Sequence, residues 1–127
     1  MTNHFHLLVE TPIPNIAIGM HALKASFAQH FNRRHGTVGH VFEGRYRTEL
    51  VTKDAHLVEA ARYIVLNPIR AGLCRRPEDW TWSSYRETAG LASVSSFLAT
   101  GTIWSFFGSS TEAAQARYRQ YVDDSLH

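Results

Sequence analysis

His4 and His6 are the residues whose types and spacing most directly suggest chemistry. They stand one residue apart in the otherwise apolar stretch NHFHLLVE, residues 3–10. If this stretch is a strand, side chains two positions apart point to the same face, and the two imidazoles are neighbours. Two neutral imidazoles can bind one cation, with a third ligand supplied from elsewhere in the fold. Such a pair also arises in ordinary packing, so the pattern alone leaves a structural role open.

Tyr63 and Asn67 form a second pair whose spacing could serve chemistry. They lie on an expected helix that begins near Asp54 and ends before Pro68, because the residue before a proline disfavours helical geometry. The apolar stripe of this helix consists of Leu57, Ala61, Ile64 and Val65. At about 100° per residue, Tyr63 falls about 145° and Asn67 about 105° from the centre of that stripe. Tyr63 is either an ordinary surface residue or a phenol presented at a site, with Asn67 one turn away as an oxygen ligand.

A phenol needs help to act as a nucleophile at neutral pH, because its ordinary pKa is about 10. The help can come from a base, or from a metal ion that activates the group under attack. A cation held by His4 and His6 would polarise a phosphate oxygen in this way. If Tyr63 is presented at a site, each pair would therefore compensate for a weakness of the other.

Positive charge is concentrated in the middle of the chain. The net charge is +2, but residues 24–76 contain ten Lys and Arg against four Asp and Glu, a net of +6 that leaves −4 for the rest. An uneven distribution of this kind indicates a polyanion partner, although a solvated face with no partner is the alternative. The candidates for phosphate contact are Arg33, Arg34, Arg45, Arg47 and Arg70.

Length and composition predict a single domain. The chain has 127 residues, of which 44% are apolar and 19% charged, as in ordinary soluble proteins. Its apolar runs are too short to span a bilayer, and its first residues do not resemble a secretory signal. A lone cysteine, Cys74, cannot form an internal disulfide. We expect a cytoplasmic protein with no membrane partner.

Periodicity predicts both helices and strands. Helices are expected around residues 16–35, from Asp54, weakly over 91–98, and near the C-terminus after a capping box from Ser109 to Glu112. Two strands are expected, over residues 4–10 and 46–51. A short helical turn should follow Pro77, with Trp80, Trp82 and Tyr85 packed on the core.

Four stretches occur in an order that resembles a known family. They are MTNHFHLLVETP, HFNRRHGTVGHVFEGRYRTELV, RYIVLNPIRAGL and PEDWTWSSY, which together span about residues 1–86. Their pattern is similar to that of the REP-associated tyrosine transposases, which belong to the single-tyrosine HUH transposases. HUH denotes histidine, a bulky hydrophobic residue and histidine, here His4-Phe5-His6.

The resemblance implies an α+β, ferredoxin-like HUH fold in one domain over residues 1–127. Residues 1–86 would form the HUH and tyrosine core, and residues 87–127 a helical C-terminal extension. In the family a strand and a helix precede the histidine motif, whereas this sequence starts at the motif. We therefore expect the fold to be incomplete at the N-terminus, which would leave a sheet edge that a second copy could cover in a homodimer.

The family's activity implies a role for each pair. Its members cleave and rejoin single-stranded DNA near hairpins through a 5′-phosphotyrosine intermediate. Tyr63 would be the nucleophile, while His4, His6 and Asn67 would hold Mg²⁺ or Mn²⁺, with zinc second on ligand type. An inactive DNA-hairpin-binding remnant is the main alternative, and a small metal-binding domain unrelated to DNA is another.

Overall fold

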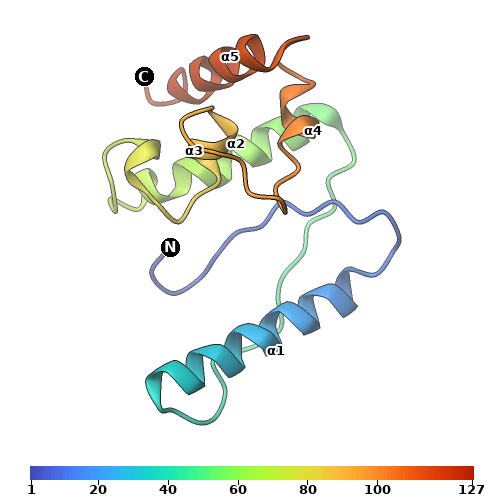
Figure 1. Ribbon diagram of the computed structural model, residues 1–127, viewed down its shortest axis with the longest axis vertical. Coiled ribbons are helices and arrows are strands. Elements are labelled where there is room, and N and C mark those ends of the chain that lie inside the picture. The colour runs from blue at the N-terminus through green and yellow to red at the C-terminus, as the bar shows by residue number, and fades with distance from the viewer. The chain divides into compact units, whose positions relative to one another are not determined.

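The computed structural model describes all residues, 1–127, and its regular structure is entirely helical (Figure 1). The elements are α1 (Ile16–His35), α2 (Asp54–Arg70), the 3₁₀ helix η1 (Pro77–Asp79), α3 (Tyr85–Thr88), α4 (Thr100–Trp104) and α5 (Thr111–Asp123). The chain divides into two compact units. The first unit consists of Met1–Leu8 and Val51–His127, and the second unit is Val9–Leu50. No helix combines the length and the apolar character that crossing a membrane requires.

The predicted α+β ferredoxin-like fold is wrong, because the structure contains no strand and therefore no sheet. Residues 4–10 and 46–51, the two predicted strands, are irregular. Alternating apolar residues favour an extended backbone, but a strand also needs a neighbour that satisfies its peptide groups. Neither segment has one, and Val9 and Leu50 remain exposed. The alternation of apolar residues in these segments says nothing about whether a partner strand is present.

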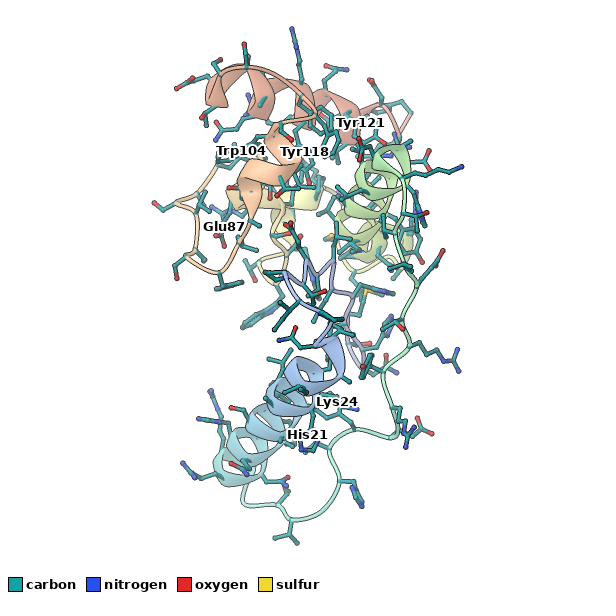
Figure 2. All side chains as sticks on the ribbon, turned by 90° about the vertical axis from the view of Figure 1, so that its right-hand side faces the viewer. His21, Lys24, Glu87, Trp104, Tyr118 and Tyr121 are labelled. Atoms are coloured by element: carbon teal, nitrogen blue, oxygen red, sulfur yellow. The ribbon has the colours of Figure 1, made fainter.

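The core of the first unit lies between α2, α3 and α5. Its buried members are Val65, Leu66, Tyr85, Ala89, Tyr118 and Val122. The rings of Tyr85 and Tyr118 lie 6.0 Å apart, and Phe107 meets Tyr118 edge-on at 5.6 Å. Trp104 donates a hydrogen bond from Nε1 to the backbone oxygen of Thr88 at 2.8 Å. Figure 2 shows Trp104 and Tyr118 where α4 meets α5.

Helix α2 continues through Pro68. The sequence predicted that the helix would end before this proline, and that prediction is wrong. Proline lacks an N–H group, so one intrahelical hydrogen bond is lost at this point. The backbone beyond it is still bonded, since the N–H of Ala71 donates to the oxygen of Asn67 at 2.9 Å. Pro68 itself is buried. The continuation places Tyr63, Asn67 and Arg70 on one regular helix.

The second unit is built around α1. The left-handed conformation of Gly36, with φ of 63°, ends the helix, as the sequence predicted. The following loop is tied back to the helix: Lys24 Nζ donates to the oxygen of Gly44 at 2.6 Å, and Asn32 Nδ2 donates to that of Gly39 at 3.0 Å. Met20 is the one buried residue of α1. The other large apolar residues at helical spacing along α1 are largely exposed: Leu23, Phe27 and Phe31.

The C-terminal region confirms some predictions and corrects others. Helix α5 is present, but its N-cap is Ser110 rather than Ser109, and the Ser110 hydroxyl accepts the N–H of Ala113. The weak helix expected over residues 91–98 is absent. Of the expected aromatic cluster, Tyr85 is buried at 2% exposure, whereas Trp82 is 85% exposed. The prediction that Trp82 packs on the core is therefore wrong.

Candidate functional site

His6 contacts both members of the pair on α2. Its Nε2 atom lies 2.8 Å from Nδ2 of Asn67, a residue 61 positions away in the sequence. The ring of Tyr63 lies edge-on to His6, with 5.9 Å between the ring centroids. The ring of His4 is 5.2 Å from that of His6. All four residues that the sequence selected for chemistry thus meet at one place, which we call the histidine–tyrosine site.

Helix α2 positions its side of the site through its opposite face. Val65 and Leu66 are buried in the core of the first unit, which fixes the rotation of the helix about its axis. Tyr63 then lies on the outer flank, with 48% of its side chain exposed, and Asn67 follows one turn later, half-buried. The predicted flank is confirmed. It results from helical periodicity, which is local and needs no knowledge of the fold.

Arg70 extends the site by one more turn of α2. Its guanidinium carbon lies 5.3 Å from the centre of the Tyr63 ring, a cation–π arrangement. At an exposed position such a contact stabilises by about 0.5–1 kcal/mol. A guanidinium also binds phosphate oxygens in a bidentate manner. Arg70 therefore lies beside the Tyr63 ring, as the resemblance would require of a phosphate contact next to the phenol.

The surroundings of His6 favour its neutral form. Burial lowers the pKa of His6 below its ordinary value, and the neighbouring His4 lowers it further. Burial acts because it disfavours the charged imidazolium, and His4 acts because two positive rings would repel each other. Neutral imidazole is the form that offers a lone pair to a metal ion. The lowered pKa of His6 thus favours the form that the predicted role requires.

Asn3 is a participant that the sequence did not reveal. Its Oδ1 atom lies 2.8 Å from Nδ1 of His4. Because an amide oxygen only accepts, this contact is a hydrogen bond when His4 carries its proton on Nδ1, the tautomer that leaves the lone pair on Nε2. A hydrogen bond of this kind commonly orients a histidine that binds a metal. The one signal in the sequence was the position of an asparagine directly before the histidine pair.

With the amide of Asn67 turned, the spacing of His6 and Asn67 would suit two ligands of a divalent ion. Neighbouring ligands of an octahedral ion with bonds of about 2.1 Å are separated by about 3.0 Å. The 2.8 Å separation between His6 and the amide end of Asn67 is close to this value. Rotation of the amide would exchange its nitrogen for Oδ1, an oxygen ligand. With Nε2 of His4, the protein could supply three ligands.

The ligand set is sparse. The structure has no group of three or more His, Cys, Asp and Glu side chains that could hold a metal. Two imidazoles and one amide oxygen would leave several coordination positions for water or phosphate oxygens. An incomplete shell of this type suits an ion that binds a substrate better than a closed structural site.

The remaining candidate DNA contacts lie outside the histidine–tyrosine site. Arg70 belongs to it, as described above. The other four arginines all belong to the second unit and are exposed: Arg33, Arg34, Arg45 and Arg47. Each unit therefore carries part of the predicted contact set.

Comparison with protein-family models, with curated proteins and with solved structures gives no match. The likeness of the four sequence stretches to the transposases thus remains an expectation. What this protein does has to be inferred from the side chains that meet at the histidine–tyrosine site.

Proposed function

We propose that this protein is a metal-dependent nuclease and transposase that cleaves and rejoins single-stranded DNA near hairpins. Tyr63 is the nucleophile, and His4, His6 and Asn67 hold Mg²⁺ or Mn²⁺. The supporting observation is that His6 approaches Asn67 and Tyr63 at the same time. We further propose that the likeness to the REP-associated tyrosine transposases reflects this chemistry.

The reaction exchanges one phosphodiester for another. The hydroxyl oxygen of Tyr63 attacks the phosphorus, the new ester bond forms, and the bond from phosphorus to the 3′ oxygen breaks. The phenol proton passes to solvent, and the departing 3′ oxygen takes one up, which gives a 5′-phosphotyrosine and a free 3′-hydroxyl. A bound divalent ion would supply charge stabilisation at the phosphate. Arg70 holds the non-bridging oxygens, and attack by a 3′-hydroxyl reverses the step and rejoins DNA.

A DNA-hairpin-binding remnant without turnover is the second candidate. One observation favours it: the amide nitrogen of Asn67, rather than its oxygen, faces His6. In this arrangement the two side chains satisfy each other and present no pair of ligand atoms. A protein that kept this hydrogen bond in the presence of Mn²⁺ would still carry the arginines proposed to contact DNA, but it would not bind the ion.

Detection of a covalent adduct tests the proposal. The full chain is incubated with Mn²⁺ and a hairpin that carries a single-stranded flank, labelled at its 3′ end in one sample and at its 5′ end in another. We expect a denaturant-resistant adduct that carries the 3′-end label and not the 5′-end label, because the protein is joined to the 5′ phosphate. Tyr63→Phe should abolish it. Tyr121→Phe, which removes a phenol elsewhere in the first unit, should leave it intact.

The alternatives give different results. Salt-sensitive binding of the hairpin without an adduct would favour the remnant. An adduct that persists in Tyr63→Phe would exclude this tyrosine as the nucleophile. Absence of both adduct and DNA binding would overturn both candidates.

A further inference from the structure

The second unit carries a row of neighbouring rings. Phe27 and Phe31 lie 6.1 Å apart with 29° between their planes, and Phe31 lies 4.3 Å from the ring of His35. Phe42, from the loop after α1, comes within 5.8 Å of Phe27. We call these four residues the aromatic row. They form a continuous series of π faces along the C-terminal half of α1.

The aromatic row is not a buried core. Phe27 is 53% exposed and Phe31 is 39% exposed. Met20 is the one buried residue of the second unit, and it precedes the row by about two turns of helix. Large apolar side chains that remain exposed together usually mark a surface that binds something.

Positive charge accompanies the rings. Lys24 Nζ lies 4.9 Å from the centre of the Phe42 ring, and Figure 2 shows Lys24 on α1. Arg34 follows Phe27 by seven residues, so the two lie within about 20° of each other around the helix. Residues 9–50 contain five Lys and Arg against three Asp and Glu. Two cationic side chains, Lys24 and Arg34, therefore share the side of α1 that carries the rings.

We propose that the aromatic row binds single-stranded DNA, with bases stacked on Phe27 and Phe31 and phosphates held by Lys24 and Arg34. The choice of DNA rests on the proposed function, which needs a single-stranded substrate. Stacking requires bases with a free face, and a duplex hides those faces.

Charge complementarity selects DNA over a second copy of this chain. A symmetric dimer through the aromatic row would place the same face of both copies together. Both copies would bring the same excess of positive charge, five Lys and Arg against three Asp and Glu in residues 9–50, and like charges across an interface cost free energy. The phosphates of a single strand supply the opposite charge, and its bases supply the flat apolar surface.

Binding of a base-free strand tests the proposal directly. The affinity of the full chain for an oligothymidylate of about 20 nucleotides is measured by fluorescence anisotropy and compared with that for an abasic strand of equal length and charge. EDTA is included, so that neither metal nor cleavage contributes. Each stacked base should increase affinity about 5- to 150-fold, so the oligothymidylate should bind at least about fivefold more tightly. Equal affinities would overturn the proposal.

Variants locate the effect. The double variant Phe27→Leu/Phe31→Leu removes both rings but keeps apolar side chains, and it should bind the oligothymidylate no better than the abasic strand. Phe27→Tyr/Phe31→Tyr keeps two stacking faces and should retain the preference for bases. Phe97→Leu, at a side chain of the first unit that is 82% exposed, is the matched control and should behave as wild type. If the leucine variant loses helix content, the proposal is still tested by the tyrosine variant and by the comparison of the two strands with the wild-type protein.

The remaining outcomes separate this proposal from the proposed function. Base-dependent binding without a Tyr63 adduct supports the aromatic row and rejects the catalysis. A Tyr63 adduct with base-independent binding rejects the aromatic row and supports the catalysis. Tighter binding of oligouridylate than of oligothymidylate would overturn the assignment to DNA. A dimer that forms without DNA and competes with the oligothymidylate would assign the row to a second copy instead.

Discussion

At the scale of single residues, the histidine–tyrosine site depends on which nitrogen and oxygen atoms are free to act. His6 offers a neutral ring because burial and His4 disfavour its charged form. His4 offers Nε2 because Asn3 holds its Nδ1 proton. The neutral form of His6 and the tautomer of His4 can each be altered by one substitution that leaves that histidine, a proposed metal ligand, in place.

The pH dependence of His6 is the first prediction. Its pKa in the folded protein is lowered from 6.5, so the unfolded chain binds the proton more readily. The contribution of His6 to stability is therefore present above pH 6.5 and is lost as pH falls toward the lowered pKa. In His4→Asn the pKa of His6 should rise, because one nearby positive charge is removed. Histidine NMR measures both pKa values, and an unchanged His6 titration would contradict the assigned cause.

Replacement of Asn3 tests the orientation of His4. Asn3→Leu removes the acceptor for Nδ1, so His4 can adopt the other tautomer, and Mn²⁺ affinity should fall about 10- to 100-fold. Asn3→Asp keeps an acceptor oxygen and should retain most of the affinity. Titration of the full chain with Mn²⁺, followed by electron paramagnetic resonance, measures the bound ion. Equal losses in the two variants would mean that Asn3 does not act through its oxygen.

At the scale of elements, α2 uses one face for packing in the core and the other for the proposed site. Its inner face supplies Val65 and Leu66 to the core, and its outer flank supplies Tyr63 and Asn67 to the histidine–tyrosine site. Substitutions on the two faces should therefore have different consequences.

Leu66→Ala should lower the free energy of unfolding by about 2–5 kcal/mol, because it leaves a cavity at a fully buried position. Leu66 has 0% of its side chain exposed. Tyr63→Phe should change stability by no more than about 0.5 kcal/mol, since the hydroxyl lies on an exposed flank. Urea unfolding followed by circular dichroism measures both. A large destabilisation by Tyr63→Phe would mean that the tyrosine is structural.

Sequence periodicity predicted the helices well, because helical hydrogen bonds join residues four apart. It placed α1, the end at Gly36 and the outer flank of α2 correctly. It failed at Pro68, where burial of the ring outweighs the cost of proline within a helix. It also failed for residues 4–10, because the existence of a strand depends on a distant partner that periodicity does not describe.

At the scale of the whole molecule, the residues proposed to contact DNA belong to two compact units. The histidine–tyrosine site and Arg70 belong to the first unit, and the aromatic row and four exposed arginines belong to the second. The concentration of charge over residues 24–76 is visible in the sequence, and the contacts of Phe31 with Phe27 and His35 follow from their four-residue spacing on a helix. The contact of Phe42 with Phe27 could not be predicted, because it requires the loop after α1 to fold back, where the hydrogen bond from Lys24 to Gly44 ties it to the helix.

The salt dependence of DNA binding should report the charges of the second unit. For single strands, the slope of log K against log salt concentration changes by about 0.7 for each phosphate neutralised. Arg34→Gln should make the slope for the oligothymidylate less steep by about 0.7. Arg86→Gln, an exposed arginine of the first unit, is the control and should leave the slope unchanged. The same slope in wild type and Arg34→Gln would remove Arg34 from the contact set.

The short distance from His6 to Asn67 has a thermodynamic consequence for the chain between them. The two residues are 61 positions apart, so an ion shared by them would act as a reversible cross-link that closes a long loop. Because His6 and Asn67 are brought together only in the folded chain, the ion would bind the folded state and raise the melting temperature with its concentration. The whole of Val9–Leu50 lies inside that loop. Binding of the ion would thus hold together the two parts of the first unit that flank Val9–Leu50 in the sequence.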